Sequence, residues 1–140
     1  MKDDRDPDAS SLAHPPTSAV SRFLRSFYFA FAGLAYLFRT QRNARVHLTL
    51  GAAACGLAAW LGVSRVEWAV VIFTIALVLI LEGLNTAVEA AIDLASPQVH
   101  PLAKAAKDLA AGMVLIAAMA SVAVGLLILG PPLWRKVAGG

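Results

Sequence analysis

The chain has 140 residues, of which 59% are hydrophobic and only 15% are charged. A soluble globular domain carries about 25% charged residues, so this composition excludes an ordinary soluble domain and indicates a membrane protein. The net charge of +3 comes without a basic patch interleaved with aromatic residues, which argues against nucleic acid binding. The single cysteine, Cys55, lies in an apolar run and has no partner for a disulfide.

Residues 1–17 are rich in Asp, Pro and Ser and predict a disordered tail, followed by one membrane domain over residues 18–136. The first segment of this domain, residues 20–40, has a helical pattern rich in aromatic residues and carries arginines near both ends. Such a segment is typical of an amphipathic helix that lies in the membrane interface. A fourth spanning helix is the alternative, but the uncharged stretch 27–38 has twelve residues, too few to span a bilayer unaided.

Three long apolar segments predict transmembrane helices. The expected spans cover residues 46–63, 68–95 and 102–130. A polar interruption at residues 40–47 precedes the first span, and the short hydrophilic turn 64–67 separates it from the second. Two prolines break the chain within 96–101, and a further pair ends the third span at 130–132. The expected fold is therefore an all-α membrane protein with a surface helix and three spans.

Basic residues near the span ends predict the orientation of the chain. Five of them lie before the first span or at the start of the third: Arg39, Arg42, Arg45, Lys104 and Lys107. The turn between the first two spans has only Arg65. The positive-inside rule therefore places the N-terminus and the 96–108 loop in the cytoplasm. Arg135 and Lys136 would then lie outside, which counts against this orientation.

The second span carries polar side chains on one face. These residues are Glu82, Asn85, Glu89 and Asp93. With 3.6 residues per turn they fall within about 80° of the helix circumference. Charged groups are costly at membrane depth, so an ionisable residue there is a candidate functional residue. The stripe therefore predicts a reaction centre close to the membrane surface.

Each residue of the stripe suits a different task. Glu82 is the deepest, and because burial disfavours the charged form of a carboxylate, it is a candidate general base; the alternative is a structural glutamate satisfied by a partner helix. Asn85 could orient a neighbouring carboxylate or cap a buried carbonyl. Glu89 offers the oxygen ligand that Mg²⁺ takes beside substrate phosphates. Asp93 is equally well explained as a solvated acid at the helix end.

Lys107 and Asp108, at the start of the third span, form a second candidate group. The lysine could hold a phosphate, and the aspartate a ribose or a Mg²⁺-bound water; the alternative is an ordinary interfacial pair whose lysine reaches to the headgroups. The sequence contains no Walker A glycine loop, kinase catalytic loop or Cys/His metal cluster. An enzyme of this sequence that uses ATP would therefore not be a P-loop protein.

Three motifs resemble those of a known family. The segment 82–89 (EGLNTAVE) resembles the E-x-x-N-(S/T)-A-(I/V)-E signature of the small prokaryotic integral-membrane lipid kinases, the bacterial diacylglycerol kinase and undecaprenol kinase family. The segment 100–112 (HPLAKAAKDLAAG) is similar to the second signature of the family. The segment 42–47 (RNARVH) is similar to an R-N-x-x-x-H element of the undecaprenol kinase branch. The resemblance covers about residues 20–130.

This resemblance implies a homotrimer in the prokaryotic cytoplasmic membrane, with active sites shared between neighbouring subunits and facing the cytoplasm. It implies transfer of the γ-phosphoryl group of ATP to the hydroxyl of a membrane lipid, with Mg²⁺. The branch-like motifs favour undecaprenol as the acceptor, and diacylglycerol is the alternative. Two alternatives without enzymatic activity are a catalytically silent membrane scaffold and a small ion or proton channel, although a channel leaves Lys107 and Asp108 unexplained.

The resemblance also implies roles for individual residues. Glu82 would take the proton of the lipid hydroxyl, with Asn85 and Arg22 beside the lipid. Glu89 and Gln41 would be the metal ligands. The residues implied to contact the nucleotide form a larger set: Arg22, Phe29, Gln41, Glu89, His100, Lys107 and Asp108. Phe29 stands where some members have a tyrosine near ATP.

Gln41 departs from the family pattern, which usually has a glutamate here that shares the metal with the Glu89 position. An amide oxygen can ligate Mg²⁺ but brings no charge, so we expect weaker metal binding. Three interpretations are open: weaker Mg²⁺ dependence, compensation by a neighbour such as Asp93, or lost activity. The intact remainder of the site favours an active enzyme, because triphosphate oxygens supply most ligands to such a metal.

Overall fold

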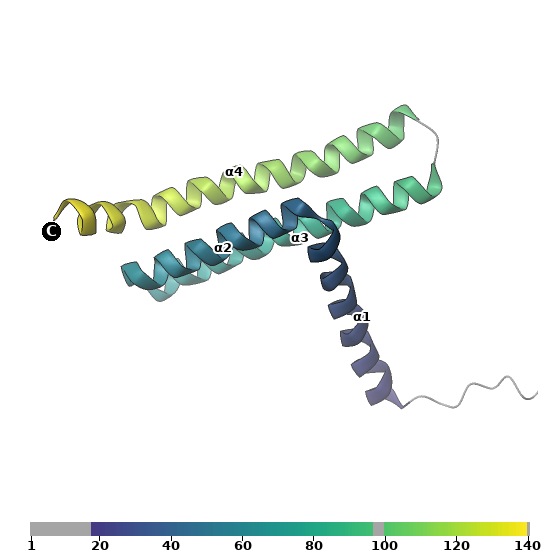
Figure 1. The fold of residues 1–140 in the computed structure, drawn as a ribbon, viewed down its shortest axis with the longest axis horizontal. Coiled ribbons are helices and arrows are strands. Elements are labelled where there is room, and N and C mark those ends of the chain that lie inside the picture. Colours follow the sequence, from purple (N-terminus) through teal and green to yellow (C-terminus); the bar gives the residue numbers. More distant parts are fainter. Residues whose placement is uncertain (1–17, 97–99, 140) are drawn as a thin grey trace, which may run out of the picture. The chain divides into compact units, whose positions relative to one another are not determined.

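The computed structural model describes residues 18–96 and 100–139, and the expected tail, residues 1–17, lies outside this part of the chain. The described residues form four helices and no strand (Figure 1): α1 (Ala19–Thr40), α2 (Arg42–Leu61), α3 (Arg65–Ala95) and α4 (Pro101–Ala138). Among them α2, α3 and α4 are long and apolar enough to cross a membrane. The predicted all-α fold with three spans is confirmed, and the trimer stays a prediction.

The chain divides into two compact units between Tyr36 and Leu37. The first unit holds most of α1, whose aromatic side chains are exposed. Neighbouring rings on this helix pack edge to face, with 5.0 Å between the ring centroids of Phe23 and Phe27. Because α1 is not among the helices that are apolar enough to span, its place at the membrane surface remains the preferred interpretation.

The break between α1 and α2 is a single residue. Gln41 has extended backbone angles (φ −96°, ψ 114°), and α2 begins at Arg42. The polar segment 40–47 thus contains the break, and most of it forms the first turns of α2. Polar side chains at a helix end stay solvated while the backbone keeps its hydrogen bonds. The guanidinium of Arg45 also donates to the carbonyl oxygen of Arg39 (3.2 Å), which satisfies one of the free carbonyls at the end of α1.

A tight turn joins α2 to α3. Gly62 ends α2 in the left-handed conformation (φ 68°), which glycine adopts without steric cost, and its N–H donates to the carbonyl of Ala58. Ser64 and Glu67 then form a capping box, in which the Ser64 N–H donates to Glu67 Oε2 (2.7 Å) and the Glu67 N–H to Ser64 Oγ (3.3 Å). The Gly62 cap ends α2, and the capping box starts α3 at Arg65.

The third predicted span continues beyond its expected end at 130–132, because α4 runs through Pro131 and Pro132 to Ala138. Proline removes a backbone donor, but its fixed φ is close to the helical value. The end of α4 is also tied to the end of α2. Lys136 Nζ donates to the carbonyl oxygen of Trp60 (2.7 Å) and lies 4.4 Å from the centroid of its indole ring. This contact holds the final turns of α4 in place.

The helices α2, α3 and α4 pack against one another, and α3 and α4 share the most extensive contact. Gly51 of α2 is buried, and a Cβ there would come within 2.8 Å of Ile75 Cγ2 on α3. The two helices therefore approach closely at this glycine, as small residues permit in membrane bundles. Most large apolar side chains of the bundle are exposed, so in a membrane they are available to lipid or to other copies of the chain.

Candidate functional site

The polar stripe of α3 runs from a buried to an exposed environment. Glu82 is only 3% exposed, Asn85 and Glu89 are half-buried, and Asp93 is exposed near the C-terminus of the helix. Thr86, one turn from Glu82, is also buried, and its hydroxyl donates to the Glu82 carbonyl oxygen (2.9 Å). The helix thus carries one carboxylate inside the bundle and presents the next ones progressively to the surface.

Glu82 lines a cavity of about 230 Å³ between α2, α3 and α4. Half of its lining is polar and half is apolar: Asn43, His47, Glu82, Asn85, Ala111, Val114, Leu115 and Ala118. The buried carboxylate is therefore next to a space that can receive a small part of a ligand. This cavity is the strongest candidate for a reaction centre in the described part of the chain.

Asn43 and His47 are site residues that the sequence did not identify as such. They stand four residues apart on α2, and this spacing puts both side chains on the same helix face. Their signal was the R-N-x-x-x-H element, which contains both, but a motif without a partner helix gives no function to either. The structure supplies the partner, because both line the cavity with Glu82 and Asn85 of α3.

Asn85 connects the buried and exposed parts of the stripe. Its amide nitrogen donates to Glu89 Oε1 (3.1 Å), so it holds the orientation of that carboxylate. Its own Oδ1 is buried and has no hydrogen-bond partner among the described residues. A buried acceptor without a donor costs about 1–3 kcal/mol. A donor from a ligand or a second copy of the chain would satisfy it.

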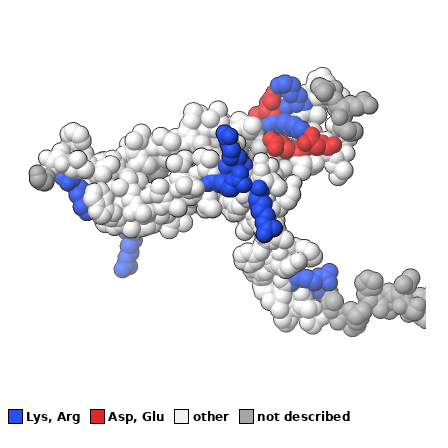
Figure 2. Space-filling model, viewed as in Figure 1, with Lys and Arg blue, Asp and Glu red and all other residues white. Residues whose placement is uncertain are grey.

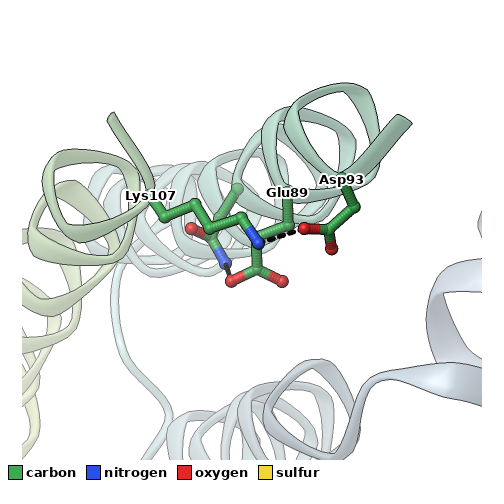
Figure 3. Close-up of polar contacts among 4 residues, drawn as sticks. Glu89, Asp93 and Lys107 are labelled. Atoms are coloured by element: carbon green, nitrogen blue, oxygen red, sulfur yellow. Dashed lines mark hydrogen bonds and ion pairs between the residues drawn. The ribbon is translucent and has the colours of Figure 1, made fainter. Parts of the chain in front are cut away.

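One lysine of α4, Lys107, contacts the outer end of the stripe (Figure 3). Lys107 Nζ donates to Asp93 Oδ1 across the α3–α4 contact, and the view shows the lysine reaching across beside Glu89. Asp108 instead pairs with Lys104, one turn earlier on α4. Figure 2 shows these charges gathered where α3 ends and α4 begins. Lys107 and Asp108 therefore have different ion-pair partners, and their proposed nucleotide contacts stay predictions.

Three other predicted site residues lie elsewhere. His100 is the N-cap of α4, where its Nδ1 accepts from the Leu102 N–H (3.2 Å), so it has a structural role in starting the helix. Arg22 and Phe29 lie on α1 within the first compact unit, and both are exposed. Phe29 packs edge to face with Tyr28, at 5.6 Å between ring centroids. The proposed ligand contacts of these three residues stay predictions.

The predicted metal ligands, Gln41 and Glu89, offer oxygen atoms, which are the ligands Mg²⁺ prefers. Gln41 makes no capping hydrogen bond with its side chain at the start of α2. Glu89 accepts the hydrogen bond from Asn85 with Oε1, so Oε2 of Glu89 can face a cation. The described residues bring together no group of three His, Cys, Asp or Glu side chains that could hold a metal. A Mg²⁺ ion at Glu89 would therefore take most of its ligands from substrate phosphates.

Comparisons with known proteins agree with this geometry. A family model described as prokaryotic diacylglycerol kinase matches residues 28–129. The chain is similar to a diacylglycerol kinase of Synechocystis sp., at 50% identity over 111 residues that make up 79% of this chain and 63% of that protein. It is also similar to an undecaprenol kinase of Bacillus subtilis, at 41% identity over 116 residues that make up 81% of this chain and 93% of that protein.

A diacylglycerol kinase of Escherichia coli is 28% identical over 113 residues, which cover 81% of this chain and 93% of that protein. The match to the Synechocystis protein spans less than two thirds of that protein's length. The region matched by the family model includes the whole acidic stripe, His100, Lys107 and Asp108, but it leaves out Arg22.

Proposed function

Because this chain belongs to the prokaryotic diacylglycerol kinase family, we propose that it is a membrane lipid kinase that phosphorylates the hydroxyl of undecaprenol with ATP. The observation that carries this proposal is the buried carboxylate of Glu82 beside a cavity that is half polar and half apolar. Such a cavity suits the hydroxyl end of a lipid. The lysine Lys107 lies nearer the surface, at the end of the same stripe, where a triphosphate could reach it.

In the proposed reaction the acceptor hydroxyl oxygen attacks the γ-phosphorus of ATP. A bond forms between that oxygen and the phosphorus, the bond to the β–γ bridging oxygen breaks, and ADP leaves. The hydroxyl proton passes to the carboxylate of Glu82. Since phosphoryl transfer depends mainly on positioning and on charge stabilisation, the remaining residues need only hold the reactants. Arg22 and Asn85 would lie beside the lipid, and Lys107 would hold the triphosphate.

Glu89, with the amide oxygen of Gln41, would hold Mg²⁺, which when bound neutralises charge on the phosphates. The hydrogen bond from Asn85 fixes the direction in which Glu89 presents its free oxygen. Arg22, Phe29, His100 and Asp108 complete the proposed nucleotide contacts. In this scheme the buried Glu82 accepts the hydroxyl proton, and Glu89, nearer the surface, binds the Mg²⁺ that neutralises the phosphates.

The acceptor is proposed to be undecaprenol on two grounds. The motifs at 42–47 and 100–112 resemble those of the undecaprenol kinase branch, and the similarity to the Bacillus undecaprenol kinase covers nearly all of that protein. Diacylglycerol is the second candidate, because the Synechocystis relative, at 50% identity, is named a diacylglycerol kinase. Both lipids present a primary hydroxyl, so the same proton acceptor would serve either.

We propose that the protein works as a homotrimer in the prokaryotic cytoplasmic membrane, with its N-terminus and the Asp93–Lys107 end of the bundle facing the cytoplasm. The basic residues in the first turns of α2 and α4 support this orientation. Arg135 and Lys136 count against it; of the two, Lys136 contacts Trp60 through a hydrogen bond and a cation–π contact. The exposed apolar side chains of the bundle leave surface for contact between subunits.

Phosphate transfer from labelled ATP to undecaprenol and to diacylglycerol, measured side by side in mixed micelles with Mg²⁺, tests the proposal. We expect transfer to both lipids to be detectable and kcat/KM to be higher for undecaprenol. A preference for diacylglycerol would assign the second candidate function. No transfer to either lipid from a correctly folded protein would support the catalytically silent scaffold.

Gln41→Glu tests the proposed metal site. We expect this substitution to lower the Mg²⁺ concentration that gives half-maximal rate, because it adds a second negative ligand beside Glu89. The measurement is a Mg²⁺ titration of lipid phosphorylation at saturating ATP. An unchanged or higher requirement in Gln41→Glu would remove Gln41 from the metal site.

A further inference from the structure

A second cavity adjoins the one that Glu82 lines. It has a volume of about 130 Å³ and lies between the same three helices. It is lined by three helices: His47, Leu50, Gly51 and Ala54 of α2, Ile75 and Val78 of α3, and Ala118, Ser121 and Val122 of α4. Among these described residues only His47 and Ser121 are polar. The second cavity is thus mostly apolar, whereas the Glu82 cavity is half polar.

The two cavities follow one another along the bundle. They share His47 and Ala118. On α3 the second cavity is lined as far as Val78, which lies one turn before Glu82. On α2 it extends to Ala54, about 10 Å beyond His47 at 1.5 Å per residue. On every helix its remaining residues therefore lie further from the Asp93–Lys107 end, so it continues the Glu82 cavity toward the middle of the apolar spans.

A half-polar cavity that continues into an apolar one suits a polyprenol better than diacylglycerol. In a polyprenol the carbon that bears the hydroxyl continues directly into hydrocarbon. In diacylglycerol two ester groups lie within a few bonds of the hydroxyl, and their carbonyls would enter a cavity with few donors. A polar group buried without a hydrogen bond is costly. Apolar cavities of about 150 Å³ stay dry and take a benzene-sized molecule, so the second cavity has room for about one isoprene unit.

We propose that the second cavity holds the first hydrocarbon segment of the acceptor, and that it selects alcohols whose hydroxyl carbon continues into hydrocarbon. This inference rests on the proposed lipid kinase activity and assigns a tail-binding subsite to the same reaction centre. The hydroxyl then lies at Glu82 and the tail leads past His47 toward Ala54 and Ser121. The small residues Gly51, Ala54 and Ala118 in the lining leave room for this segment.

Filling the subsite tests the inference. Ala54→Leu adds volume from α2, and Ser121→Val adds a smaller volume from α4, so the test does not depend on one variant folding. Ala53→Leu is the matched control, because Ala53 is an exposed neighbour that does not line either cavity. KM and kcat are measured for undecaprenol, diacylglycerol and ATP.

We expect Ala54→Leu to raise KM for undecaprenol roughly tenfold or more, in line with the effect of one misplaced hydrocarbon group in an apolar pocket. Ser121→Val should raise it by less, and KM for ATP should stay as in the wild type in both. Ala53→Leu should match the wild type throughout. The inference would be overturned if the wild-type protein preferred diacylglycerol. It would also be overturned if KM for undecaprenol in the subsite variants equalled that of Ala53→Leu. A wild type that phosphorylates neither lipid would instead refute the proposed function.

Discussion

Glu82→Gln is expected to lower kcat for lipid phosphorylation roughly 10²- to 10⁴-fold, the usual contribution of a positioned general base. Glutamine keeps the size of the side chain but cannot take the hydroxyl proton. Glu82 is buried and lines the cavity with Asn43, His47 and Asn85, so no neighbouring carboxylate of this cavity can replace it. The measurement is the steady-state rate with undecaprenol at saturating ATP and Mg²⁺.

The control for this variant lies on the same helix. Glu67→Gln changes the same side chain at the opposite end of α3, where glutamine can fill the capping box as glutamate does. It should keep wild-type activity. If Glu82 served only to hold the bundle together, Glu82→Gln would lower the thermal unfolding midpoint while its kcat stayed close to that of Glu67→Gln. A loss of kcat with an unchanged midpoint supports the role as base.

The helices themselves could be predicted from the sequence, because each span is a long apolar run bounded by turn residues. The ends of the helices could not. The polar composition of 40–47 does not reveal that the break is Gln41 alone and that α2 begins at Arg42. The prolines at 131–132 were interpreted as a stop, but the contact between Lys136 and Trp60 holds the helix beyond them. That contact joins residues 76 positions apart, and no local pattern reveals it.

The site residues, too, could be predicted from the sequence only in part. Helical periodicity within α3 was enough to place Glu82, Asn85 and Glu89 on one face, since periodicity depends on one helix alone. It does not reveal which side chains of another helix meet that face. His47 of α2 joins Glu82 at the cavity, and Lys107 of α4 pairs with Asp93 of α3. Both facts depend on how the helices pack.

The ion pair between Lys107 and Asp93 bears on how the site receives a nucleotide. The Lys107 side chain is 34% exposed and that of Asp93 67% exposed. Ion pairs at such exposed positions contribute about 0–1 kcal/mol. A charged hydrogen bond to a phosphate is worth more, about 1.5–3 kcal/mol. If Lys107 contacts a triphosphate as proposed, it would give up only this weak, exposed ion pair to do so.

Lys107→Met is accordingly expected to lower kcat/KM for ATP roughly ten- to hundredfold, since each 1.4 kcal/mol corresponds to a factor of ten. The loss should fall mainly on ATP, and KM for the lipid should change little. Arg135→Met is the control, because it removes an exposed positive charge from the far end of the same helix. Initial rates over a range of ATP concentrations, at saturating lipid and Mg²⁺, give the comparison.

Asp93→Asn tests whether Lys107 contacts a phosphate or only links α3 to α4. This variant breaks the same ion pair but leaves the lysine in place. If Lys107 acted only by joining α3 to α4, both variants would lose the same activity and the same thermal stability. If Lys107 binds the triphosphate, Asp93→Asn keeps or improves kcat/KM for ATP, because the lysine no longer has to leave a partner. Equal losses in the two variants would therefore refute the nucleotide contact and leave the ion pair as a structural link between the helices.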